Sequence, residues 1–261
     1  MVTLLYNNKE YTIASEYNEL TGMQLIKLAP LLKSVVKDDL LVKLQVLKVL
    51  MNVSPSAFYF MSLDLRERAL EHVEWVFEKN TLTKQLLPEI DGYHGPKTCF
   101  DNLTLEEYHC AEIFYSDLIA DGDAAALDKL VAVLYRKPKS LFYNQEKDPA
   151  GDIRKPFNEH EIDYWAKKIS KWPTDTKQAI LLWYDGCRQH LISLYAAVFT
   201  PTQPTTEQAD TKGMFGVMRQ IADGNKYGQF EHVKKLNIHT ALLEMEQLIK
   251  EAAEANKLSQ S

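Results

Sequence analysis

The stretch Phe100–Tyr108, FDNLTLEEY, marks the start of a helix more clearly than any other part of this sequence. Thr104 and Glu107 have the spacing of a capping box, in which each side chain accepts a hydrogen bond from a backbone N–H that the first helical turn leaves unpaired. Leu103 and Tyr108 stand at the spacing of the hydrophobic staple that accompanies such a cap. The pattern predicts a helix over residues 105–120.

Other helix signals follow toward the C-terminus. Asn158 and Glu161 repeat the capping pattern and predict a helix over 159–171. A further helix is expected over 124–136, behind a turn-forming Asp-Gly-Asp sequence. Residues 174–199 can form one long apolar helix in which Gly186 is a local weakness rather than a break. The interval 137–156 is polar and contains prolines, so we expect a long surface loop there.

The N-terminal half begins with a predicted β-hairpin. Residues 4–6 and 11–13 are β-prone and flank a turn-prone centre. Helical spacing over 20–32 is interrupted by Pro30, which predicts a bent helix or two short ones. Residues 38–51 are apolar at nine of fourteen positions, so this helix should lie in the core or in a subunit interface. A capping signal at Asp64 predicts an amphipathic helix over 65–79.

Composition narrows the class of protein. The 261 residues include only 10 glycines and 10 prolines, which favours helices. The net charge of −6 lacks the basic excess of a dedicated nucleic-acid binder. Three cysteines at long spacings fit neither a disulfide framework nor a zinc module, and no signal sequence or membrane-length apolar run is present. We expect a cytoplasmic protein that binds neither nucleic acid nor a membrane.

The C-terminal part has a different composition. Residues 200–211, TPTQPTTEQADT, contain no large apolar side chain and are predicted to be a mobile linker. Within the helical segment 212–261, five apolar residues follow a 4-3-4-3 spacing and should form one seam, namely Ile238, Leu242, Met245, Ile249 and Ala252. The predicted fold is therefore mainly α: a helical domain over 1–199 with an N-terminal hairpin, the linker, and a C-terminal helical segment.

The sequence contains no familiar catalytic motif. It lacks a Gly-x-Ser-x-Gly elbow and the glycine-rich phosphate loops. Glu106 and His109 have the spacing of a metal-binding pair, but the second pair that a di-iron site needs is absent. Cys99 beside His94, and Cys187 beside His190, are candidate thiol and base pairs, although buried inert thiols are commoner. We predict no catalytic, cofactor-binding or metal-binding residue and no enzymatic activity.

Three C-terminal stretches resemble the end of some bacteriophage tail assembly chaperones. They are Met214–Ala222, Tyr227–Val233 and Leu242–Glu246, which give a helix, an aromatic-glycine turn and a further helix. The stretch Phe100–Tyr108, with Leu134–Arg136 later, is similar to structural and assembly proteins of phages and prophages infecting Bacteroidetes.

The resemblance implies a non-enzymatic protein that escorts the long helical tape-measure protein during tail building. The apolar seam and the linker are compatible with this role, because a helix with an apolar seam on a mobile linker can bind an amphipathic partner helix. The alternatives are that this helix docks on its own domain, that the protein is a virion connector or ring subunit, or that it is a Cys99/His94 enzyme. Self-association also stays open. The residues expected to contact the partner are Ile238, Leu242, Met245, Ile249, Phe215, Tyr227 and Phe230.

Overall fold

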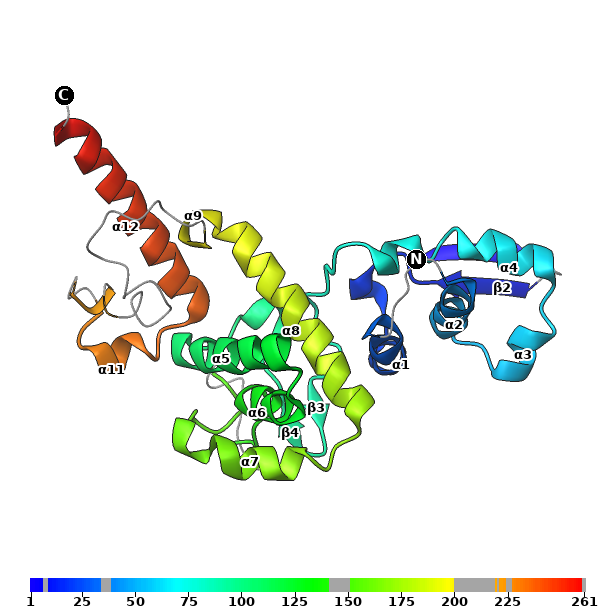
Figure 1. The fold of residues 1–261 in the computed structure, drawn as a ribbon, viewed down its shortest axis with the longest axis horizontal. Helices are drawn as coiled ribbons and strands as arrows, with labels where there is room; N and C mark the ends of the chain where they lie inside the picture. The colour runs from blue at the N-terminus through cyan, green and yellow to red at the C-terminus, as the bar shows by residue number, and fades with distance from the viewer. Residues whose placement is uncertain are drawn as a thin grey trace. The chain divides into compact units, whose positions relative to one another are not determined.

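The computed structural model confirms the mainly-α class with a small N-terminal hairpin (Figure 1). It describes residues 1–6, 9–33, 39–140, 151–199, 219, 221–223 and 227–259. These residues form two compact units, and each contains two separate stretches of the chain. Within the described residues, no helix is both long enough and apolar enough to span a bilayer.

Unit 1 consists of Met1–Leu87 and Trp172–Gln189. Strand β1 (Val2–Tyr6) pairs antiparallel with β2 (Lys9–Ile13), with Val2 opposite Ile13, as the hairpin signal predicted. Four helices and two short 3-10 turns follow: η1 (Tyr17–Glu19), α1 (Gly22–Lys33), α2 (Leu40–Leu50), α3 (Pro55–Tyr59), α4 (Leu63–Leu70) and η2 (Glu74–Phe77). The fully buried side chains of this part include Ile13, Leu25, Leu28, Leu47, Leu50 and Leu65.

Helix α1 runs through Pro30 as one element, so the alternative of two short helices does not hold. One helix of unit 1 differs from the sequence prediction. The helix predicted over 65–79 starts earlier, where the Ser62 hydroxyl accepts a hydrogen bond from Leu65 N, and it ends at Leu70. The next residues form η2 instead, and there Tyr17 packs edge-on against Trp75. Tertiary packing therefore shortens this helix in spite of its amphipathic pattern.

Helix α8 (Thr174–Leu194) is continuous through Gly186 and contributes to unit 1 as far as Gln189. Asn80 Nδ2 donates to Leu182 O (2.7 Å), and Trp183 Nε1 donates to Thr83 O (3.2 Å). A Cβ built on Gly186 would lie 2.2 Å from Leu82 O. Glycine at 186 thus lets the segment around Leu82 lie directly on the helix backbone.

Tyr17 gives unit 1 a pH-dependent contact. Its buried hydroxyl donates to Val76 O (2.6 Å), and burial, together with the charge of Asp185, raises the pKa of Tyr17 to about 12. Because the folded protein holds this proton more tightly than the unfolded chain, whose tyrosine pKa is about 10, the stability contribution is complete below pH 10 and falls between pH 10 and 12.

Tyr17→Phe should therefore lose less stability than the wild type over that pH range. Urea unfolding at a series of alkaline pH values measures the difference, and Tyr59→Phe provides the control because Tyr59 is 75% exposed. Identical pH profiles for Tyr17→Phe and the wild type would show that Tyr17 ionises as readily in the folded protein as in the unfolded chain.

Unit 2 consists of Pro88–Lys171 and His190–Ser261. The small sheet of β3 (Glu89–Ile90) and β4 (Tyr93–His94) precedes the 3-10 turn η3 (Thr98–Phe100) and helices α5 (Leu105–Asp121) and α6 (Ala124–Leu134). The turn η5 (Glu159–Glu161) leads into α7 (Ile162–Ile169), and the C-terminal part contains α9 (Ala196–Phe199), α11 (Phe230–Val233) and α12 (Ile238–Ser259). Helix α6 packs against both α5 and α7 (Figure 1).

This division differs from the predicted domains. The predicted domain 1–199 is split between both units, and the described part of segment 212–261 belongs to unit 2. The physical reason is hydrogen bonding between stretches that are distant in sequence. In unit 1, α8 is bonded to residues 80–83. In unit 2, residues 234–238 are bonded to the start of α5. The predicted linker 200–211 lies outside the described residues.

Candidate functional site

The start of α5 is completed by the C-terminal part of the chain. An α-helix leaves its first four N–H groups without partners inside the helix. In α5, Glu107 N donates to Thr104 Oγ1 (3.2 Å) and Thr104 N donates to Glu107 Oε2 (3.1 Å), so the predicted capping box is confirmed. The other two donors reach across the unit: Leu105 N donates to Leu236 O (2.8 Å) and Glu106 N to Lys234 O (3.0 Å).

We call residues 101–107 together with 234–239 the helix junction. Asn237 Nδ2 donates to Asp101 O (2.6 Å), and Ile238 N donates to Leu103 O (2.9 Å). Lys234 Nζ forms an ion pair with Glu106 (3.0 Å), and a hydrogen bond to this carboxylate raises the pKa of Lys234. His239 Nε2 lies 2.8 Å from Cys99 O, and its Nδ1 lies 3.2 Å from Tyr195 Oη. The beginning of α12 is therefore held in unit 2 by backbone and side-chain bonds.

Glu107 of the helix junction also belongs to a group of four charges, three of which are buried. We call Glu107, Arg136, Asp152 and Arg154 the charge cluster. Arg154 is fully buried and contacts both carboxylates, with Nη2 3.2 Å from Glu107 Oε2 and Nε 2.8 Å from Asp152 Oδ2. Arg136 donates to the second oxygen of Glu107. Two positive and two negative charges cancel, which is what the burial of ions requires.

Backbone carbonyls satisfy further donors of the two arginines. Arg154 Nη1 donates to Leu134 O (2.9 Å), and Arg136 Nη1 donates to Val133 O (2.8 Å), so both guanidinium groups bind the end of α6. Burial lowers the pKa of Arg136, whereas for Arg154 the attraction of Glu107 and Asp152 outweighs the effect of burial and raises its pKa. The charge cluster thus connects α5, α6 and the chain around residue 154.

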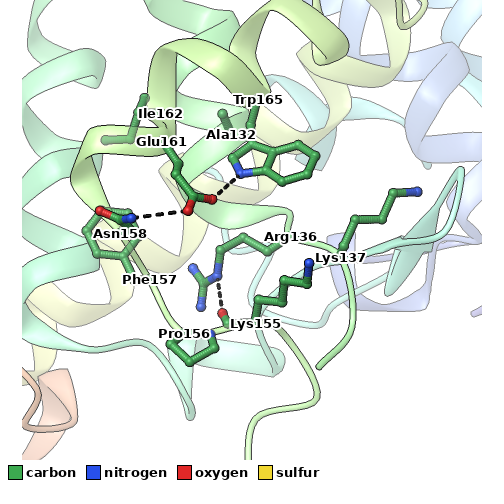
Figure 2. A pocket seen from close by; sticks show the side chains of 10 residues that line it. All are labelled: Ala132, Arg136, Lys137, Lys155, Pro156, Phe157, Asn158, Glu161, Ile162 and Trp165. Atoms are coloured by element: carbon green, nitrogen blue, oxygen red, sulfur yellow. Dashed lines mark hydrogen bonds between the residues drawn. The ribbon is translucent and has the colours of Figure 1, made fainter. Parts of the chain in front are cut away.

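A small pocket lies on one side of Arg136 (Figure 2). Figure 2 shows that its polar groups bind one another: Trp165 Nε1 donates to Glu161 (2.9 Å), and Asn158 Nδ2 donates to the same carboxylate (3.1 Å). These two bonds lower the pKa of Glu161. The cavity volume of about 20 Å³ holds one or two water molecules but no organic substrate. This pocket therefore does not provide a substrate site.

The predicted partner-binding residues occupy different environments. Ile238 and Leu242 are fully buried and Met245 is 5% exposed, all on the face of α12 that packs inside unit 2 against α5 and α9. Ile249, one helical step further on, is half-buried. The structure therefore has the alternative arrangement in which the seamed helix docks on its own unit. Binding of a partner by these residues stays a prediction.

The aromatic residues assigned to a partner lie beside the same helix. Tyr227 donates from Oη to Glu244 on α12 (3.1 Å), and Gly228 has a φ of 82°, a left-handed conformation that glycine adopts without strain. Phe230 starts α11, and its ring lies 5.7 Å from Lys234 Nζ. Tyr227 and Phe230 are half-buried, while Phe215 lies outside the described residues.

The candidate histidine His94 and the candidate cysteine Cys187 both contact other groups. His94 Nδ1 is 3.9 Å from Glu89, and its backbone pairs with Arg136. The thiol of Cys187 points to the carbonyls of Leu82 and Thr83. Within the described ranges, no group of three or more His, Cys, Asp or Glu side chains could hold a metal ion. Burial also lowers the pKa of His109, which favours a neutral imidazole over an ion-pairing one.

The three thiols should differ strongly in reactivity. Burial raises the pKa of Cys110 to about 11, which reduces its thiolate fraction near pH 8 by about 100-fold relative to a thiol of pKa 9. Cys187 is fully buried, whereas Cys99 is half-buried. In a timed iodoacetamide reaction followed by peptide mass spectrometry, we expect Cys99 to react at least about tenfold faster than the other two.

Urea-unfolded protein is the control for this experiment, because all three thiols should then react at similar rates. Faster modification of Cys110 than of Cys99 in the folded protein would contradict the buried position of Cys110 in α5.

The sequence signals found only part of this site. The capping box identified Thr104 and Glu107, but the pairing of Glu107 with two arginines was missed. Residues 137–156 were predicted as a surface loop, and this is wrong at Arg154, which is fully buried. A polar residue in a polar stretch gives no sign of burial. Glu107 gave no hint either, because the capping box already accounted for its carboxylate.

No protein-family model, no curated protein and no solved structure matches this chain.

Proposed function

We propose that this protein is a non-enzymatic assembly factor of the phage tail chaperone kind, which binds a helical protein partner such as the tape-measure protein. One observation carries the proposal. The stretches Phe100–Tyr108 and Leu134–Arg136, which resemble phage assembly proteins, are joined by the bond from Arg136 to Glu107. The start of α5 is also bonded to residues 234–238, the short segment that connects the resembling stretches Tyr227–Val233 and Leu242–Glu246. The resemblance therefore falls on one connected structural element.

The folded unit restricts how such a partner could bind. If the seam residues Ile238, Leu242 and Met245 bound the partner, α12 would have to leave unit 2, and the two α5 N–H groups paired with Lys234 and Leu236 would be exposed. Binding that leaves unit 2 intact uses the outer face and the far half of α12 instead. Leu243 is 59% exposed there, and residues 251–254 are exposed as well. We therefore place the partner along Leu243 and Ile249.

Co-expression tests this proposal. The chain is produced with the tagged tape-measure protein from the same genome, and the complex is isolated by affinity and size-exclusion chromatography. We expect a stable complex, and we expect the double variant Leu243→Ser with Ile249→Ser to weaken it by at least about tenfold, as is usual for the loss of apolar anchors.

The matched control is Ile119→Ser, which removes an aliphatic side chain that is 66% exposed on α5. This variant should bind the tape-measure protein as the wild type does. Failure of the wild type to form any complex would contradict the proposal. Recovery of the chain in stoichiometric amount from purified virions would also contradict it, because a chaperone leaves before the particle matures.

A further inference from the structure

The turn η3 in front of α5 contains two consecutive residues in the left-handed backbone conformation, Cys99 with a φ of 55° and Phe100 with a φ of 64°. This conformation brings the Cβ of an L-residue too close to the following carbonyl oxygen, so it costs free energy for most residues other than glycine. The other non-glycine residues with a positive φ in the described part of the chain are Asn52 and Asp91, whose types adopt it most easily. Cys99 and Phe100 are therefore strained, and surrounding contacts must hold them.

The two strained residues are held in different ways. Phe100 is fully buried, and the centroid of its ring lies 6.2 Å from that of Tyr108, which is also buried. Cys99 is half-buried, and its carbonyl oxygen accepts a hydrogen bond from His239 Nε2 (2.8 Å) at the start of α12. Burial of its own ring thus stabilises the conformation of Phe100, whereas the conformation of Cys99 is supported by the C-terminal part of the chain.

Residues 234–239 bind this turn and the start of α5 through the backbone. The carbonyl oxygens of residues 99, 101 and 103 accept hydrogen bonds from residues 237–239. In the opposite direction, the N–H groups of Leu105 and Glu106 donate to the carbonyl oxygens of residues 236 and 234. Because the docked segment holds Cys99 in its strained conformation, this strain opposes the docking of residues 234–239.

Helix α5 keeps a start of its own when these bonds break. Thr104 N and Glu107 N have their acceptors in the capping box, and Tyr108 N donates to Thr104 O. In the first turn, the N–H groups of Leu105 and Glu106 lose their acceptors. Opening of the helix junction therefore exposes these N–H groups without unfolding α5.

We propose that η3 and the helix junction form a strained latch, which opens while α5 stays folded. In the closed latch, the seam residues Ile238, Leu242 and Met245 are buried inside unit 2. Opening moves the start of α12 away from α5 and uncovers this seam, so the latch controls whether the seam can contact another helix. The strain at Cys99 sets the balance, because it raises the free energy of the closed latch only. The latch does not depend on the proposed tape-measure complex, whose predicted contacts lie on the outer face and the far half of α12.

Amide hydrogen exchange of the full-length protein, followed for each residue by NMR, measures the opening of the latch. After correction for intrinsic rates, the N–H groups of Leu105 and Glu106 should exchange at least about tenfold faster than that of Tyr108, whose acceptor lies within α5. Global unfolding exposes all three groups alike, so the difference measures the latch. Equal protection of the three groups would show that the junction opens only when α5 unfolds, which overturns the proposal.

Cys99→Gly tests the role of the strain, and Cys99→Ala is its matched control. Both variants lack the thiol, but only glycine adopts the left-handed conformation without strain. Exchange at Leu105 and Glu106 should be at least about threefold slower in Cys99→Gly than in Cys99→Ala, because the closed latch is then relieved of strain. Equal rates in the two variants would also overturn the proposal. Circular dichroism checks that both variants are folded.

Oxidation of Met245 by hydrogen peroxide measures whether the seam is uncovered. Met245 is 5% exposed, so its thioether should react mainly in the open latch. Peptide mass spectrometry should find slower oxidation of Met245 in Cys99→Gly than in Cys99→Ala. Met23 is 61% exposed in unit 1 and should react at the same rate in both variants. Equal oxidation of Met245 in the two variants would show that the seam stays covered, and the latch would then not control it.

Discussion

Glu107→Gln is expected to lower the free energy of unfolding by about 3–5 kcal/mol, the usual cost of breaking a buried ion pair by removing one partner. The substitution keeps the size of the side chain but leaves Arg136 and Arg154 with one carboxylate, Asp152, between them. The Glu107 side chain is 2% exposed, so water cannot replace the lost charge. The amide also weakens the capping box, because a neutral acceptor binds Thr104 N less strongly.

Urea unfolding followed by circular dichroism measures this loss, and hydrogen exchange of α5 assigns it to unit 2. Asp117→Asn is the control, since it neutralises an exposed carboxylate on the same helix and should change stability by less than about 0.5 kcal/mol. A loss below about 1 kcal/mol in Glu107→Gln would mean that the charge cluster does not depend on this carboxylate.

Gly186→Ala is also expected to lower the free energy of unfolding strongly, although helix propensity alone predicts that alanine raises it. In an exposed helix this substitution stabilises by about 0.5–1 kcal/mol. Here the added Cβ would lie 2.2 Å from the backbone oxygen of Leu82 and 2.9 Å from Asn80 Oδ1. Since the first of these is backbone, the segment at residues 80–83 must move. We expect a loss of about 2–3 kcal/mol, typical of overpacking.

The loss in Gly186→Ala should appear in unit 1. Hydrogen exchange of residues 80–83 should become faster, because the bonds from Asn80 and Trp183 weaken when this segment moves. Ser193→Ala, at an exposed position of the same helix, should leave the stability unchanged or raise it slightly. A Gly186→Ala variant as stable as the wild type would show that residues 80–83 do not need their close approach to α8.

Local signals predicted the elements of this fold well and its long-range organisation poorly. The capping box at Thr104 and the hairpin at 2–13 depend on neighbouring residues, and both are confirmed. The division into units depends on contacts between residues 80–83 and 182–187, about 100 positions apart. The periodicity of apolar residues contains no information about such long-range contacts, so the predicted domain 1–199 does not reflect them.

The candidate site shows the same limit. The apolar spacing of Ile238, Leu242 and Met245 identified a true packing face, but spacing alone does not say what covers it. The structure covers that face within unit 2. The exposure of Phe60 and Leu63 likewise left no signal in the sequence. Burial, rather than hydropathy, separates surfaces available for binding from those already occupied.

The discontinuous make-up of both units has a consequence for the newly made chain on the ribosome. Unit 1 needs residues 172–189 after residues 1–87, and the start of α5 receives its last two partners only when residues 234–236 have emerged. At a translation rate of roughly 5–20 residues per second, the first stretch of each unit waits several seconds or more for the second stretch to be synthesised. During that time the nascent chain exposes apolar side chains that the folded protein buries, so its yield in the cell should depend on molecular chaperones and on the speed of translation.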